Sequence, residues 1–339
     1  MATERQSPGG AAASAFFVAG TAVALAWLLA PLFELLLLVF AGVLVAVVLR
    51  GVSAWIARHS PLPEGWATAL TLVALALTGV VLTWFAGARI ATQVDDLRRT
   101  LPAAASNAAD WLKGQAWGQP LLSRLYDAGD VLTGKGALSR AGGALSTAVG
   151  GVGSLILFVF VALFVTLDPS PYRRGLLLLV PSTRRERAAR VLDDVGQALR
   201  GWMLGKIISM TAVGLLTWVG LLFLGVPLPL TLALIAALLT FIPNFGPVLS
   251  AVPAVLLALM SGPAKAAWVG GLYLAVQAVE SYLVTPFVQK KTLSLPPALT
   301  IVSQAILGTV AGGVGLVVAT PLTAAVLVLF RELYVDKSE

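Results

Sequence analysis

An all-α, multi-pass integral membrane protein is the fold class that the amino-acid sequence predicts. Of the 339 residues, 58% are hydrophobic and only 12% are charged, and the mean hydropathy is +0.91. Soluble domains carry about 25% charged residues, so a water-soluble fold of this chain could not cover its surface. The apolar residues also gather into runs of about 20, the length that crosses a hydrocarbon core as an α-helix.

Six of these runs are expected to cross the membrane fully. They cover residues 15–30, 32–49, 66–88, 145–167, 203–224 and 266–285. Pro31 separates the first two runs, because a proline inside a helix removes a hydrogen bond and clashes with the preceding turn. Residues 1–14 are small and polar and predict a disordered cytoplasmic tail, and residues 334–339 are expected to form a cytoplasmic tail.

Two further apolar regions, residues 228–260 and 297–330, are too long for one crossing and are each interrupted near the middle. The sequence IPNFGP interrupts the first at residues 242–247, and AGGVG interrupts the second at residues 311–315. Broken apolar segments in corresponding positions are a pointer to a transporter's binding site, so we predict two re-entrant helical hairpins. Prolines flank the hairpins with the same spacing, at Pro229 and Pro253 and at Pro297 and Pro321. Hairpins that enter from opposite faces predict an inverted repeat.

Two polar segments carry helical patterns outside these spans. In residues 89–142, apolar side chains recur at helical spacing between Ile90 and Leu101, opposite charged ones. In residues 168–202, an arginine-rich helix is expected either to lie on anionic lipid or to pack on its own subunit. The chain is thus divided into a scaffold (15–142), a unit containing the fourth span and the arginine-rich helix (143–202), and a transport domain (203–333).

The basic residues predict the orientation of the chain. The 23 Lys and Arg outnumber the 16 Asp and Glu, which gives a net charge of +7. Most of the basic residues fall in short segments on one side of the predicted topology, as the positive-inside bias requires. We therefore expect both termini in the cytoplasm and the protein in a bacterial inner membrane. Nucleic acid is not expected as a partner.

Glu280 is the most informative polar residue, because it lies inside an apolar span and far from any Lys or Arg in sequence. A carboxylate at that depth costs at least about 2.5–3.5 kcal/mol, so its presence suggests a use. Gln277 shares its helix face. Burial favours the protonated carboxyl, which could exchange its proton for a cation or a polar ligand. The alternative is a structural hydrogen bond between helices.

The two interruptions supply the remaining candidate site residues. Around Asn244, the prolines Pro243 and Pro247 withdraw backbone donors, so carbonyl oxygens and the Asn244 amide could bind a cation or a hydroxylated solute. Gly246 lies in the same turn, for which the alternative is a tight connection between packed helices.

In the second hairpin, Gln304 is polar on an apolar arm, and Gly312 and Gly313 leave the tip open to close approach. Small residues also serve ordinary helix packing, which is the alternative for these two glycines.

Residue counts argue against several other kinds of site. The chain has no Cys, which excludes disulfides, thiolate metal sites and Cys nucleophiles. Its one His, His59, argues against a zinc centre or a Ser/His/Asp triad. The run GDVLTGKG at residues 129–136 lacks the Ser or Thr of a phosphate-binding loop and follows no strand. We expect no metal, no cofactor and no enzymatic activity.

Four motifs in the carboxyl-terminal half stand out together. They are FIPNFGPVLSAVPA (241–254), ESYLVTP (280–286), LSLPPAL (293–299) and GTVAGGVGLVVATPL (308–322). Residues 145–330, which contain them, resemble the autoinducer-2 exporter family of bacterial permeases. The family's tip motif falls on Pro243, Gly246 and Pro247, and its membrane glutamate falls on Glu280. Asn244 stands where relatives often have Tyr, which leaves the ligand open.

The resemblance implies an oligomeric secondary transporter, and we expect a homo-oligomer, with a pentamer as one form of it. Members of the family are linked to export of autoinducer-2 or to sodium–proton exchange. We therefore predict export of a small polar solute or signal molecule by alternating access, with the site between the hairpins and the span 266–285. A sodium–proton antiporter is the close alternative, and a non-transporting scaffold and a membrane-embedded enzyme are two others. The expected partners are the solute or a monovalent cation or proton, and the lipid bilayer.

Overall fold

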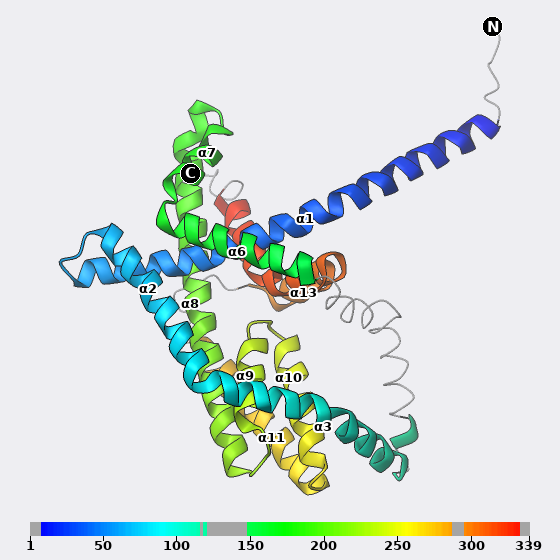
Figure 1. Ribbon diagram of the computed structural model, residues 1–339. Helices are drawn as coiled ribbons and strands as arrows, with labels where there is room; N and C mark the ends of the chain where they lie inside the picture. The colour runs from blue at the N-terminus through cyan, green and yellow to red at the C-terminus, as the bar shows by residue number, and fades with distance from the viewer. Residues whose placement is uncertain (1–7, 116–117, 121–147, 287–294, 333–339) are drawn as a thin grey trace.

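The computed structural model describes residues 8–115, 118–120, 148–286 and 295–332, and every regular element within them is helical. The all-α prediction is confirmed for these ranges. Four of the described helices are long and apolar enough to cross a membrane, and a fifth is added if two helices joined at a bend of 93° count as one span. Figure 1 shows the arrangement of the helices.

The first helix, α1 (Pro8–His59), runs for 52 residues through Pro31 without a break. The predicted division into two crossings at Pro31 is therefore wrong. One lost hydrogen bond is a small loss for so long an apolar helix, and no glycine or polar turn former follows Pro31 to reverse the chain. The helix also begins inside the tail predicted for residues 1–14, and residues 1–7 and 333–339 lie outside the described residues.

The third predicted crossing is found as α2 (Glu64–Leu82), which continues through a π-helical turn, η1 (Thr83–Gly87), into α3 (Ala88–Lys113). The amphipathic pattern is confirmed in α3, where Leu97 is buried and Asp95 and Arg98 are exposed. Helix α3 packs against the first hairpin. Most of the remaining predicted segment, up to residue 142, lies outside the described residues.

After α6 (Ala148–Leu167), the short helix α7 (Ser170–Leu178) leaves at an angle of 93°. At the bend, the Asp168 Oδ1 accepts the N–H of Ser170, the first residue of α7, at 3.0 Å. Helix α8 (Arg185–Phe223) follows and is continuous for 39 residues. It therefore crosses residue 202, where we predict a boundary between two units. A glycine in a helix costs only about 1 kcal/mol, so Gly201 and Gly205 do not end it.

The first predicted hairpin consists of α9 (Pro229–Leu239) and α10 (Phe245–Leu259), which lie side by side in Figure 1. The second is α13 (Pro297–Phe330), which is kinked at Ala311 and at Gly312, where φ is +56°. A Cβ added to Gly308 would lie 3.4 Å from the Leu316 side chain, and one added to Gly315 would overlap the Leu307 carbonyl oxygen. In a straight helix, residues eight apart are separated by about 12 Å along the axis. Both predicted interruptions are thus confirmed as chain reversals.

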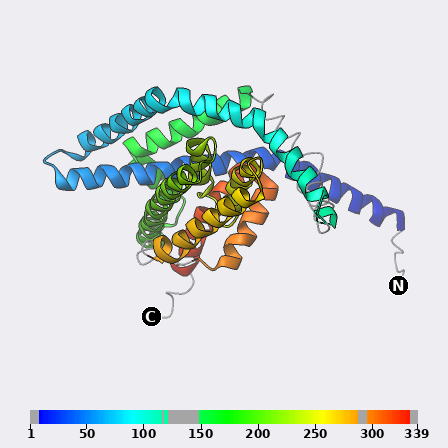
Figure 2. The ribbon, with the colours of Figure 1, turned by 90° about the horizontal axis from the view of Figure 1, so that it is seen from below.

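Helix α11 (Pro263–Val279) follows the first hairpin and passes into a second π-helical turn, η3 (Glu280–Val284). Buried apolar residues of α8 to α11, among them Leu221, Leu232 and Val269, form the main core. A smaller core, centred on Leu44 and Leu199, joins α1 to α8. Figure 2 shows α8 to α13 gathered into one group with α1 passing along its edge.

Candidate functional site

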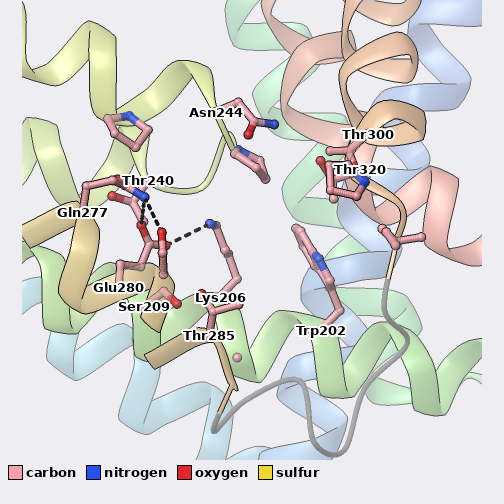
Figure 3. Close-up of a pocket in the computed structure, with 16 residues that line it drawn as sticks. Trp202, Lys206, Ser209, Thr240, Asn244, Gln277, Glu280, Thr285, Thr300 and Thr320 are labelled. Atoms are coloured by element: carbon pink, nitrogen blue, oxygen red, sulfur yellow. Dashed lines mark hydrogen bonds and ion pairs between the residues drawn. The ribbon is translucent and has the colours of Figure 1, made fainter. Parts of the chain in front are cut away.

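A cavity of about 290 Å³ lies where α8, the tip of the first hairpin, η3 and the second hairpin meet. Figure 3 shows its two walls, with Thr240, Gln277 and Glu280 on one side and Trp202, Thr300 and Thr320 on the other. Six of the lining residues carry hydroxyl groups, namely Ser209, Thr240, Ser281, Thr285, Thr300 and Thr320. Ligand pockets usually enclose about 300–1,000 Å³, so this cavity suits a small solute.

Glu280 does not lie alone at this depth. Its Oε1 is 3.7 Å from the Nζ of Lys206, and the two side chains are only 9% and 13% exposed. Although Glu280 is far from any Lys or Arg in sequence, the fold therefore gives it a basic partner. Removing one partner of a buried ion pair costs about 3–5 kcal/mol, because the other charge is left without compensation. Lys206 is the one charged residue in the predicted crossing 203–224. This lone charge in an apolar run was the sequence signal that could have identified Lys206 as a site residue.

The second carboxylate oxygen of Glu280 is held by its own helix. Gln277 donates from Nε2 to Glu280 Oε2 at 3.1 Å and to Ser281 Oγ at 3.2 Å. The helix widens from α to π geometry at Glu280, and π-helical turns are frequent at functional sites. The predicted common face of Gln277 and Glu280 is thus confirmed, and the pair fixes the direction of the carboxylate.

The tip of the first hairpin contains a strained residue. Asn244 has φ +67° and ψ −47°, and the N–H of Phe245 donates to the carbonyl of Pro243 at 2.8 Å. A hydrogen bond across one residue with these angles defines the rare form of the γ-turn. Such backbone conformations cost about 1–3 kcal/mol each and cluster at functional sites. Asn244 is exposed and lines the cavity.

Gln304 of the second hairpin donates a hydrogen bond to this turn. Its Nε2 donates to the same Pro243 carbonyl at 3.1 Å, and the residue is completely buried. Gln304 does not line the cavity, and its Oε1 is buried without a hydrogen-bond partner among the described residues. This side chain therefore links the second hairpin to the tip of the first.

Four carbonyl oxygens at the tip, where the two prolines led us to expect ligand-binding carbonyls, are already engaged in hydrogen bonds. The carbonyls of Leu238, Leu239, Ile242 and Pro243 each accept a backbone hydrogen bond. The reason is that the turn is tight enough for the chain to satisfy its own acceptors. A ligand at this site would therefore meet side chains first.

Five of the predicted site residues line the cavity, namely Pro243, Asn244, Pro247, Gln277 and Glu280. The other four lie elsewhere. Gly246 is buried within the turn, where a Cβ would overlap the Leu239 carbonyl oxygen, and Gln304 contacts the turn from the second hairpin. Gly312 and Gly313 are exposed at the second tip and are not part of the lining.

Sequence reasoning missed one wall of the cavity. Trp202, Lys206 and Ser209 follow one another at helical spacing on α8, and Thr320 comes from the second arm of α13. The available signal for the α8 residues was that Trp202, Lys206 and Ser209, which all carry hydrogen-bonding groups, recur at i, i+4 and i+7 around the start of an apolar run.

Known proteins resemble this chain over half of its length or more. A family model described as "AI-2E family transporter" matches residues 15–334. "Putative transport protein YrrI" of Bacillus subtilis (strain 168) is 28% identical over 170 residues, which are 50% of this chain and 48% of that protein. "Putative transport protein YhhT" of Escherichia coli (strain K12) is 30% identical over 178 residues, which are 52% and 50%. "AI-2 transport protein TqsA" of the same strain is 24% identical over 281 residues, which are 80% and 78%.

The chain spans about half the length of YrrI and of YhhT in these matches. The apolar helices and the relatives together identify a multi-pass membrane protein of a transport family. The family model covers nearly all of the chain, and the protein therefore belongs to the AI-2E transporter family.

Proposed function

We propose that the protein is a secondary transporter that exports a small polar solute through the cavity between the hairpin tips and η3. The observation that supports this most is the Lys206–Glu280 pair, which lies buried beside a cavity whose lining includes six hydroxyl and two amide side chains. Buried ionisable residues of membrane segments usually belong to a transport path.

The lining favours a solute without net charge. Glu280 and Lys206 balance each other, and the remaining polar groups can donate to or accept from hydroxyls. Trp202 adds an aromatic surface for an apolar side of the solute. A relative is named as an AI-2 transport protein, and we propose an AI-2-like signal molecule as the first solute to test.

Alternating access is the proposed mechanism. The two hairpins would form an inverted repeat, each entering the membrane from one side, and would move with α8 and α11 against the scaffold of residues 15–142. Because α8 is continuous from Arg185, the moving unit would begin there and not at residue 203. We propose a homo-oligomer, with a pentamer as one form of it, in a bacterial inner membrane, with both termini cytoplasmic.

A sodium–proton antiporter is the second candidate, and the same ion pair favours it. A cation could replace the Lys206 ammonium at Glu280 after Lys206 loses its proton. Four of the tip carbonyls already accept hydrogen bonds, so Glu280 and hydroxyl groups would supply most of the ligands. For this reason we place the organic solute first.

Flux measurements in proteoliposomes separate these functions. Wild type, Glu280→Gln and the control Glu64→Gln, which changes an exposed acid at the start of α2, are compared for AI-2 flux and for proton movement after a pH jump in sodium-loaded vesicles. We expect AI-2 flux in wild type and the control, and at least a tenfold loss in Glu280→Gln. Equal flux in all three would refute the role of Glu280. Sodium-dependent proton movement without AI-2 flux would establish the antiporter instead.

A further inference from the structure

Three arginines gather at a corner where three apolar helical stretches end. Arg50 follows the apolar run of α1, and Arg200 precedes the apolar run of α8. Arg174 belongs to α7, which begins just after the apolar helix α6. Apolar runs end where the hydrocarbon core meets the headgroups. The ends of these apolar runs therefore predict that the corner lies at the depth of the lipid headgroups.

The helices are packed so that two of these side chains reach neighbouring positions on α1. A Cβ added to Gly51 would lie 3.1 Å from the Cδ and the Nε of Arg200, so the Arg200 side chain lies across this glycine. Arg50 extends its Nη1 to the carbonyl oxygen of Thr166, at the end of α6, at 3.4 Å. The Arg50 and Arg200 side chains thus both lie at the same turn of α1, Arg50 against the end of α6 and Arg200 across Gly51.

The corner has more positive charge than its own acids balance. Arg200 is half-buried, forms no ion pair within the described ranges, and its Nε is buried without a hydrogen-bond partner there. Arg173, next to Arg174, is already paired with Asp193 at 2.8 Å. A half-buried guanidinium without a counter-ion is unfavourable, so an anion is expected beside it.

Asp168 is the acid of this corner, but it is exposed and serves another role. It accepts the N–H of Ser170, the first residue of α7, at 3.0 Å. This hydrogen bond holds the pKa of Asp168 below its usual value, and the charges of Arg174 and Arg50 act in the same direction. Asp168 is therefore ionised near neutral pH, and it balances one of the three arginines.

We propose that Arg50, Arg174 and Arg200 bind the phosphate of an anionic phospholipid. Guanidinium groups match phosphate oxygens with paired hydrogen bonds, and basic pockets between membrane helices bind anionic headgroups. The neighbouring surface of α6 fits the acyl chain, because Phe160, Phe164 and Leu167 are exposed there and the two rings stack at 5.7 Å. This apolar surface favours a lipid over free phosphate.

Lipid retention by the full-length protein tests the site. Wild type, Arg50→Gln, Arg200→Gln and Arg200→Lys are purified in detergent with phosphatidylglycerol or phosphatidylcholine, and bound lipid is counted by native mass spectrometry. We expect wild type to retain phosphatidylglycerol selectively and each Gln variant to bind it roughly 10- to 100-fold more weakly. Arg200→Lys should be intermediate, because it keeps the charge without the fork.

The control is Arg58→Gln, which removes an equal charge from an exposed position on α1 about 12 Å further along the helix. It should retain lipid as wild type does. Equal loss of lipid in this control would overturn the proposal, and so would unchanged retention in both Arg50→Gln and Arg200→Lys. If Arg200→Gln does not fold, Arg50→Gln and Arg200→Lys still test the site. Millimolar inorganic phosphate should not displace the lipid, and full displacement would contradict a lipid ligand.

Discussion

Replacing Gln304 by Leu should loosen the tip of the first hairpin without unfolding the protein. The substitution removes the Nε2 donor that reaches the Pro243 carbonyl at 3.1 Å and leaves the Phe245 N–H as its remaining partner. A hydrogen bond of this kind contributes about 0.5–1.5 kcal/mol net, which is comparable with the strain of about 1–3 kcal/mol at Asn244. The strained turn should therefore lose roughly two- to tenfold in population relative to relaxed alternatives.

Global stability should change less than local order does. Leu also removes the buried Oε1 that has no partner among the described residues, and this removal offsets part of the lost hydrogen bond. Hydrogen exchange measured by mass spectrometry reads the tip directly, because the Phe245 amide is bonded only across the γ-turn. We expect faster exchange in peptides covering residues 241–250 and a nearly unchanged thermal midpoint.

Thr309→Val is the matched control for this experiment. It removes a hydrogen bond within the same arm of α13, from the Thr309 hydroxyl to the Ala305 carbonyl, at an exposed position. Exchange at the tip should stay as in wild type. If Gln304→Leu also left tip exchange unchanged, the reasoning that this side chain holds the turn would be refuted.

Three further substitutions have expected outcomes. Lys206→Met should destabilise the protein by about 3–5 kcal/mol, and adding Glu280→Gln should recover much of that loss in a thermal double-mutant cycle. Additive effects of the two substitutions would contradict the ion pair. Gly315→Ala should reduce the yield of monodisperse protein, because its Cβ overlaps the Leu307 carbonyl, whereas Gly270→Ala, with nothing within 4 Å, should not. Asp168→Ala should lower the thermal midpoint at pH 7. The fold lowers the pKa of Asp168, so the stabilisation by its carboxylate is lost as the pH falls below about 3.8. The thermal midpoints of wild type and Asp168→Ala should therefore converge at low pH. A difference that stays constant with pH would contradict the role of the hydrogen bond from Ser170.

The features that the sequence predicts correctly are local ones. Apolar runs define helices, and the IPNFGP and AGGVG interruptions place both chain reversals, because proline and a glycine at φ +56° act on their own turn. The ends of the helices are predicted less well, because neighbouring residues can override a local signal. Pro31 and Gly201 weaken a helix locally, but long apolar neighbours on both sides keep α1 and α8 continuous.

The parts of the candidate site that depend on tertiary contacts could not be predicted. Lys206 meets Glu280 only because α8 packs beside α11 and η3. Gln304 meets Pro243 only because the two hairpins touch, which turns a predicted ligand contact into a support of the tip. Periodicity places Lys206 and Gln304 on their helices but cannot say which helix lies opposite.

Chemical blocking of the cavity tests most directly whether it is the transport path. The chain has no Cys, so Ser281→Cys introduces a single thiol at an exposed position of the lining, and Ser106→Cys places a control thiol on the exposed surface of α3. Both variants are labelled with a bulky maleimide in proteoliposomes, and flux of the solute that wild type transports is measured against the labelled fraction. We predict that flux falls in proportion to labelling at Ser281→Cys and stays constant for Ser106→Cys. Full flux through completely labelled Ser281→Cys would contradict a transport path through this cavity.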